Sequence, residues 1–265
     1  HEYQPMGETE FANGQAAMAA SGQYGNTRVA AGIVGTAYLT LGERVGEVLD
    51  RQLATAPERF KGIRQAASWD ASSAVGNHRT EPGPGLYLNE QFRQGFSQLA
   101  SRNLTFEGWC FHKQISELAS LARAFPDTTI VLDHFGGPVG IGPYVGREAE
   151  VFEYWRGVID EIAECPNVHA KLGGLAMEVN GFNWQDRPTA PSSDELLESN
   201  RHYYEYTIEK FGVDRCMFES NFPVDRVSCS FTVLWNMFKR LTEHYSTDER
   251  AKLFHDNAAR VYKLA

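Results

Sequence analysis

The sequence predicts an α/β fold with a parallel sheet, and a closed (β/α)8 barrel fits the pattern best. Short apolar segments alternate with amphipathic helical patterns through most of the 265 residues. The apolar segments are continuous runs rather than alternations, which is typical of parallel strands buried on both faces. Polar residues of catalytic type follow at least five of the six runs, where a barrel places its active site.

Six strands are expected, and their connections limit the architecture. They are Val29–Leu39, Phe60–Ala66, Leu104–Phe111, Thr129–His134, Val168–Leu172 and Cys216–Ser220. Repeated βα units leave two arrangements, a doubly wound sheet or a closed barrel. No Gly-rich phosphate loop follows any of these strands, which favours the barrel. We therefore expect one barrel domain over residues 1–265, with its first one or two strands preceding His1.

The helices are marked by apolar residues that recur on one face. Three such faces are Phe92, Phe96 and Leu99; Ile115, Leu118, Ala122 and Phe125; and Val151, Trp155, Val158 and Ile162. Ser192 and Glu195 have the spacing of a capping box, and Gly212 supplies a helix stop. Two closing helices are expected around Val233–Leu241 and Asp248–Tyr262.

Composition excludes several classes of protein. The formal net charge is -9 and no run of Lys or Arg occurs, so no nucleic-acid or anionic-membrane partner is expected. The uncharged stretch Val29–Gly42 is too short to cross a bilayer. The four cysteines are scattered without a CxxC pair, which argues against a zinc ribbon or a disulfide framework. Cys110 and Cys216 are expected as buried thiols, and a cytoplasmic location fits best.

Five polar or charged residues lie at or near the expected strand ends. His112 follows the third run, His134 ends the fourth and Asn221 follows the last. Arg64 lies near the end of the second run, and Lys171 lies in the fifth. Each alone has an ordinary explanation, as a hydrogen-bonded structural histidine or a half-buried ion-pair partner. Since the carboxyl ends of barrel strands meet at one mouth, we expect the five to converge there.

Two long polar segments are expected at the same face. The loop at residues 68–87 contributes Trp69, Asp70 and His78, and Trp69 is a candidate apolar wall for a ring-shaped substrate. The segment Glu178–Pro191 is expected to cover the substrate, with a simple surface excursion as the alternative.

Four motifs carry a resemblance to a known family. LDHFGGP at 132–138, FESNFPVD at 218–225, the FH-x-Q element at 111–114 and HDNAARVYKL at 255–264 resemble the amidohydrolase-related, metal-dependent hydrolases with a TIM-barrel fold. Within this group, the motifs most resemble those of dicarboxypyrone and sugar-acid lactonases. They resemble those of aminocarboxymuconate-type decarboxylases less. The resemblance extends over essentially the whole chain.

The resemblance implies a role for each matching residue. His112 matches the fifth-strand histidine, a metal ligand or substrate-binding imidazole, and His134 matches the sixth-strand histidine that polarises the scissile carbonyl or shuttles a proton. Asn221 takes the final-strand position where the family usually carries Asp, the general base. Arg64 is expected to bind a substrate carboxylate through a bidentate contact, with Lys171 as a second substrate-binding residue.

Metal binding is left open, because the family's first-strand His-x-His pair is absent near the start of the chain. The family implies one divalent metal, zinc or manganese, and a metal-free reaction is the alternative; metal ligands are left unassigned. The amide of Asn221 cannot act as a general base, because it has no usable basic pKa.

Three acidic residues lie near the expected site. Glu219 or Asp225 is an alternative source of the missing carboxylate, but an ion pair with a nearby arginine is the preferred interpretation of both. Side chains alternate along a strand, so Asp133 is expected to point away from the side that His134 occupies.

The favoured function is hydrolysis of a small carboxylated lactone or similar ring ester by water attack. One alternative is a non-oxidative decarboxylase of an aromatic or muconate-type acid, and another is a non-catalytic acid-binding barrel. Aromatic residues of the later helices more often mark the outer core of a barrel than a dimer surface, so a homodimer is an open alternative.

Overall fold

The computed structural model describes residues 2–76 and 80–264. His78, which the sequence places in the loop at residues 68–87, lies outside the described residues.

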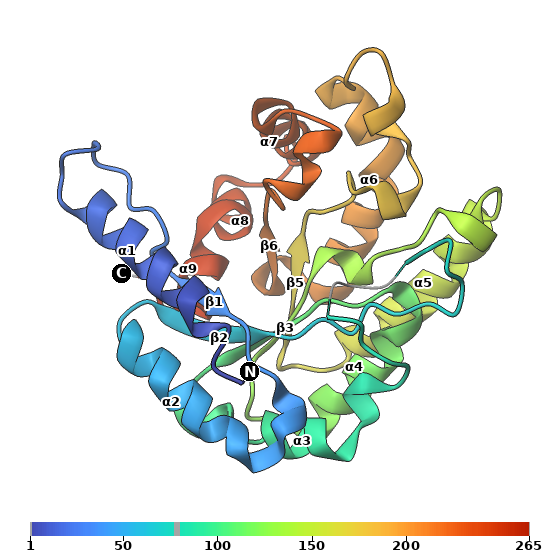
Figure 1. Ribbon diagram of the computed structural model, residues 1–265. Coiled ribbons are helices and arrows are strands. Elements are labelled where there is room, and N and C mark those ends of the chain that lie inside the picture. Colours follow the sequence, from blue (N-terminus) through green and yellow to red (C-terminus); the bar gives the residue numbers. More distant parts are fainter. Residues whose placement is uncertain (1, 77–79, 265) are drawn as a thin grey trace.

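Six parallel strands form one sheet at the centre of the molecule (Figure 1). They are β1 (Ile33–Gly35), β2 (Phe60–Arg64), β3 (Thr105–Gly108), β4 (Ile130–Leu132), β5 (Val168–Leu172) and β6 (Cys216–Phe218). All six predicted strands are confirmed, although only β5 keeps its predicted bounds. The predicted third strand ends early, since the carbonyl of Trp109 turns to accept hydrogen bonds from the Ala67 amide and the Tyr87 hydroxyl.

The order of the strands excludes the doubly wound sheet. Each strand pairs with the next along the chain, from β1 to β6, whereas a doubly wound sheet reverses its order at a switch point. Between the described strands, β1 and β6 are not paired with each other, so the sheet does not show the expected barrel closure. The register sets Arg64 beside Glu107 on β2 and β3, and Leu132 beside Ala170 on β4 and β5.

The helices follow one another around the outer side of the sheet, as Figure 1 shows for α2 to α6. They are α1 (Met6–Ala20), α2 (Val45–Thr55), α3 (Glu90–Phe96), α4 (Ile115–Ala124), α5 (Glu148–Ala163), α6 (Ser193–Phe211), α7 (Phe231–Leu241), α8 (Thr247–Ala251) and α9 (Asn257–Val261). The three predicted apolar faces lie on or next to α3, α4 and α5 and are buried except Phe125, which is half-buried. Helix α1 was not predicted, because its buried residues are the small Thr9, Ala16 and Ala19.

The predicted signals at the ends of α6 are confirmed. The Ser192 hydroxyl accepts a hydrogen bond from the Glu195 amide at 3.2 Å, and the Glu195 carboxylate accepts one from the Ser192 amide at 2.8 Å. Gly212 ends the helix with φ of 75°, a conformation that glycine adopts without strain. The last predicted helix is also present, divided into α8 and α9 by a π-helical turn.

The cysteines agree with the prediction of buried thiols. All four cysteines are buried and free, as predicted for Cys110 and Cys216. Among residues 2–76 and 80–264, no helix combines the length and the apolar character needed to cross a membrane.

Helix α5 anchors the turn that follows β4. Trp155 is fully buried, and its indole Nε1 donates a hydrogen bond of 2.7 Å to the carbonyl oxygen of Phe135. Phe135 has a φ of 60°, an uncommon value for a residue with a side chain, and it directly follows His134. The core thus fixes the backbone next to a candidate site residue.

We expect Trp155→Phe to lower the free energy of unfolding by about 1–3 kcal/mol more than a matched change, because it leaves the Phe135 carbonyl buried without a donor. The matched change is Trp235→Phe, since the Trp235 indole nitrogen is buried and has no hydrogen-bond partner among the described residues. Urea unfolding of both variants measures the difference. Equal losses of stability would contradict the proposed anchor.

Candidate active site

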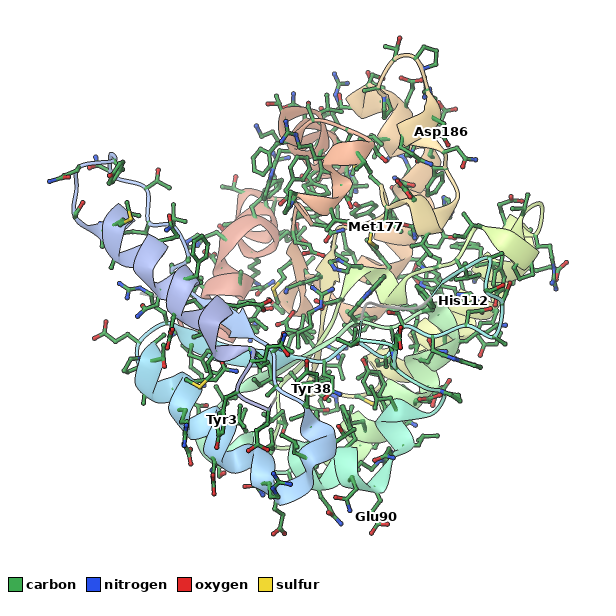
Figure 2. The ribbon with its side chains drawn as sticks, viewed as in Figure 1. Tyr3, Tyr38, Glu90, His112, Met177 and Asp186 are labelled. Carbon is green, nitrogen blue, oxygen red and sulfur yellow. The ribbon has the colours of Figure 1, made fainter. Side chains whose placement is uncertain are left out.

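A cavity of about 870 Å³ lies at the carboxyl ends of the strands. Each strand supplies at least one residue of its wall, at its end or in the loop that follows it: Thr36, Arg64, Trp109, His134, Met177 and Asn221. Figure 2 labels Met177 and Tyr38, which both line it, near the middle of the molecule. We call it the central cavity. Parallel strands with consecutive connections bring their carboxyl ends together, so this is where the fold assembles a site.

His134 is the most constrained residue of the central cavity. It is 2% exposed and has a φ of 53°, in the left-handed region. A β-carbon on Gly174, in the loop after β5, would lie 2.7 Å from Nδ1 of the His134 ring. The glycine at this position therefore makes room for the imidazole. Trp109 packs edge to face against the same ring, with 4.9 Å between centroids.

The two nitrogens of His134 have different partners. Nδ1 forms a short ion pair with Oε1 of Glu219, which follows β6. Nε2 lies 3.2 Å from an amino nitrogen of the Arg64 guanidinium, on β2. Burial alone would lower the pKa of His134, but the Glu219 carboxylate outweighs it, and the pKa is raised above its usual value of 6.5. The same pairing overcomes the burial of Glu219 and lowers the pKa of its carboxyl.

Asp133 lies behind the site, since it is fully buried and does not line the central cavity, as side-chain alternation predicts. Its carboxylate lies 3.4 Å from Nε of Arg64 and 3.4 Å from Nζ of Lys171. Burial opposes ionisation of Asp133, but the two cations prevail and lower the pKa of the carboxyl.

Lys171 extends this set of charges into the sheet. Its ammonium contacts Glu107 of β3 as well as Asp133, and Glu107 accepts a 2.6 Å hydrogen bond from the Tyr262 hydroxyl. Burial raises the pKa of Glu107 to about 7, although Lys171 opposes this. The side chain of Lys171 is engaged by two carboxylates and lies outside the wall of the central cavity. The structure therefore places Lys171 behind the site, supporting Arg64 through Asp133.

Asn221 reaches the central cavity and is held from behind by Asp225. Its Nδ2 donates a hydrogen bond of 2.7 Å to the Asp225 carboxylate, which also accepts one from the Ala176 amide at 3.3 Å. Asp225 is fully buried, and burial raises the pKa of its carboxyl to about 7. The interpretation of Glu219 and Asp225 as partners of an arginine is wrong, because they pair with His134 and Asn221.

His112 is not brought to His134. It is 2% exposed and lies outside the wall of the central cavity, toward α4 and α5 in Figure 2. Its Nδ1 accepts a hydrogen bond from the Val139 amide at 3.3 Å, and its ring packs edge to face against Tyr144 and Tyr154. Burial lowers the pKa of His112 to about 4. A catalytic role for His112 stays a prediction without support from this placement.

The two expected loops contribute less than the sequence indicates. Trp69 is half-buried, its carbonyl accepts a hydrogen bond from Gln114 at 3.0 Å, and it does not line the central cavity. The segment Glu178–Pro191 borders a different cavity through Asn180 and Phe182, and Met177 just before it lines the central one. A wall of the central cavity is formed instead by Trp109, which directly follows β3.

The described residues do not form a metal site. Across 2–76 and 80–264, no group of three or more His, Cys, Asp or Glu side chains is arranged to hold a metal ion. Both nitrogens of His134 are engaged, and a guanidinium faces the one that a metal would need. A cation at that place repels a second cation, so these residues do not fit a divalent metal.

Comparison with known proteins places the chain in a family. The profile of the amidohydrolase family matches residues 31–264. The uncharacterized protein y4mH of Sinorhizobium fredii is 38% identical, over 98% of this chain and 76% of its own length. An L-fucono-1,5-lactonase of Burkholderia multivorans is 28% identical, over 65% of this chain and 56% of its own length.

Solved structures share the fold. An amidohydrolase of Burkholderia multivorans with bound zinc matches with a TM-score of 0.76 and 23% identity, over 97% of this chain and 79% of that one. A putative 2-pyrone-4,6-dicarboxylic acid hydrolase of Pseudomonas putida matches with a TM-score of 0.60 and 17% identity, over 96% and 79%. The strand order, the site at the strand ends and these matches lead to one conclusion: the chain belongs to the amidohydrolase family.

Proposed function

We propose that this chain carries the site of a hydrolase that opens a small carboxylated lactone or a similar ring ester. The observation that carries the proposal is His134, held between Glu219 and Arg64 in the wall of the central cavity. A lactonase and a pyrone-dicarboxylate hydrolase among the similar proteins support this choice of substrate class. Arg64 favours a substrate with a carboxylate, since guanidinium binds that group in a bidentate manner.

His134 is the general base of the proposed reaction. In this proposal Nδ1 carries the proton and faces the Glu219 carboxylate, so the neutral ring keeps a lone pair on Nε2. Arg64 donates a hydrogen bond to that lone pair, with 3.2 Å between the two nitrogens. A substrate carboxylate competes for the guanidinium and leaves Nε2 able to take a proton from water. Glu219 stabilises the imidazolium that results, which compensates for the Asn at position 221.

The chemical steps balance with water as the only co-reactant. The oxygen of water attacks the lactone carbonyl carbon while Nε2 of His134 accepts a proton. The ring C–O bond of the tetrahedral intermediate then breaks, and the imidazolium returns the proton to the departing ring oxygen. The product is the open hydroxy acid, and His134 is restored to its neutral form.

Asn221 orients the attacking water in this scheme. Its Nδ2 donates to the buried Asp225 carboxylate, so its carbonyl oxygen is the end available to the central cavity. A carbonyl oxygen accepts a hydrogen bond from water but takes no proton. Asn221 therefore orients the water, as an amide can, and His134 accepts the proton.

Several expectations accompany this proposal. The sheet is proposed to be part of a closed barrel. We also propose a cytoplasmic location and no nucleic-acid partner, as the sequence predicts. A homodimer is an open alternative.

The decisive test is turnover of L-fucono-1,5-lactone and 2-pyrone-4,6-dicarboxylate by the purified protein. His134→Ala should lower kcat/KM by about 10²–10⁴-fold, since it removes the general base. His112→Ala is the matched control and should retain activity as long as its circular dichroism shows a folded protein. Near-normal turnover by His134→Ala would refute the assigned base. Equal losses in both folded variants would restore the two-histidine site predicted from the sequence.

Arg64→Gln should raise KM for 2-pyrone-4,6-dicarboxylate by about tenfold or more relative to its effect on the uncharged L-fucono-1,5-lactone. The reason is that only the first substrate offers carboxylates to the guanidinium. Arg64→Lys keeps the positive charge but lacks the planar guanidinium. Its KM for 2-pyrone-4,6-dicarboxylate should fall between those of the wild type and Arg64→Gln. If Arg64→Gln raises KM equally for both substrates, Arg64 does not bind the carboxylate.

A further inference from the structure

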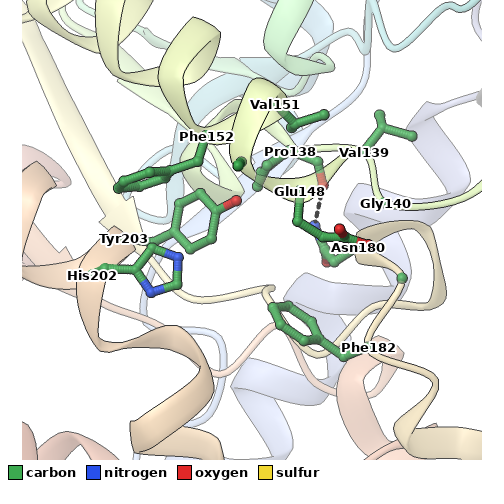
Figure 3. A pocket seen from close by; sticks show the side chains of 12 residues that line it. Pro138, Val139, Gly140, Glu148, Val151, Phe152, Asn180, Phe182, His202 and Tyr203 are labelled. Carbon is green, nitrogen blue, oxygen red and sulfur yellow. Dashed lines mark hydrogen bonds between the residues drawn. The ribbon is translucent and has the colours of Figure 1, made fainter. Parts of the chain in front are cut away.

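A second cavity, of about 260 Å³, shares no lining residue with the central cavity (Figure 3). It lies between α5 and α6, and the chain at 138–140 and 180–182 completes its wall. We call it the α5–α6 crevice. The two chain segments are joined by hydrogen bonds, from Asn180 Nδ2 to the Pro138 carbonyl and from the Gly140 amide to the Val179 carbonyl, each 2.9 Å.

Aromatic rings dominate the α5–α6 crevice. Phe152 contacts His202 and Tyr203 edge to face, with centroid distances of 4.7 and 5.1 Å. Phe182 lies across the opening from His202 and Tyr203 in Figure 3. Aromatic side chains thus line both sides of this space, which we call the slot, and they favour a flat aromatic ligand.

The hydroxyl of Tyr203 points into this slot (Figure 3). Tyr203 is 7% exposed, and Figure 3 shows its hydroxyl directed into the crevice. A hydroxyl in this position can donate or accept a hydrogen bond with a molecule bound in the crevice.

The charge of the crevice is negative. Glu148 is the charged side chain in its wall, and its carboxylate is close enough to Tyr203 to raise the pKa of that hydroxyl together with burial, to about 12. Partial burial lowers the pKa of His202, which leaves its imidazole neutral at neutral pH. Aromatic faces and a carboxylate both attract a cation.

We propose that the α5–α6 crevice binds a small, flat organic cation of the arylamidinium or arylammonium class. Its ring lies between Phe182 and the Phe152–Tyr203 pair, and its charged group lies near Glu148, with an N–H donated to the Tyr203 oxygen. This ligand has the opposite charge to the substrate proposed for the central cavity. The two sites are therefore distinguishable by ligand charge.

Titration calorimetry with benzamidine tests the proposal, with benzamide and benzoate as neutral and anionic analogues of similar shape. Benzamidine should bind saturably, benzamide more weakly and benzoate most weakly. Glu148→Gln and Phe182→Ala should each weaken benzamidine binding by about three- to tenfold. Glu148 is exposed, so its substitution does not endanger the fold. Glu164→Gln, an exposed change at the other end of α5, is the matched control and should have no effect.

Three results would overturn the proposal. One is the absence of saturable benzamidine binding to the full chain. Another is benzoate binding as tightly as benzamidine. The third is benzamidine binding that persists in both crevice variants and is displaced by 2-pyrone-4,6-dicarboxylate, which would place the probe in the central cavity.

Discussion

The site depends on one buried imidazole with a carboxylate on one side and a guanidinium on the other. His134 is almost fully buried, and such a ring is tolerated among charges only when both nitrogens are satisfied. Glu219, just after β6, faces one ring nitrogen, and Arg64, at the end of β2, faces the other. The glycine at 174 and the bond from Trp155 hold the ring and its turn in place. The fold thus fixes the position of the residue that we propose as the general base.

The charges behind His134 form a connected set rather than isolated pairs. Asp133 contacts both Arg64 and Lys171, and Lys171 contacts Glu107, which also binds the Tyr262 hydroxyl near the end of the chain. Removing one member of such a buried set leaves another without its partner, which is more damaging than losing an exposed ion pair. Among the described residues, Arg64 supplies a guanidinium to the wall of the central cavity, and Lys171 contacts the Asp133 carboxylate behind it.

Local patterns predicted the fold well, whereas the site required three-dimensional information. The six strands, the caps of α6 and the faces of α3 to α5 follow from periodicity and capping residues in the sequence. Helix α1 was not predicted, because its buried residues are small and form no apolar pattern in the sequence. Strand ends indicated His134, Arg64 and Asn221, but they could not show that Asp133 contacts both Arg64 and Lys171. Which carboxylate meets which cation depends on neighbours far apart in the chain, so Glu219 was assigned the wrong partner.

The tautomer and pKa of His134 test this account most directly, and they need no substrate. We would follow the imidazole ¹⁵N resonances through a pH titration of the wild type and of Glu219→Gln. The account predicts a neutral form protonated on Nδ1, a wild-type pKa above 6.5, and a lower pKa in Glu219→Gln because the carboxylate that favours the imidazolium is gone. As pH rises through the raised pKa, the basic form becomes populated, and activity should rise with it. A wild-type pKa at or below 6.5, or one unchanged by Glu219→Gln, would contradict the central claim.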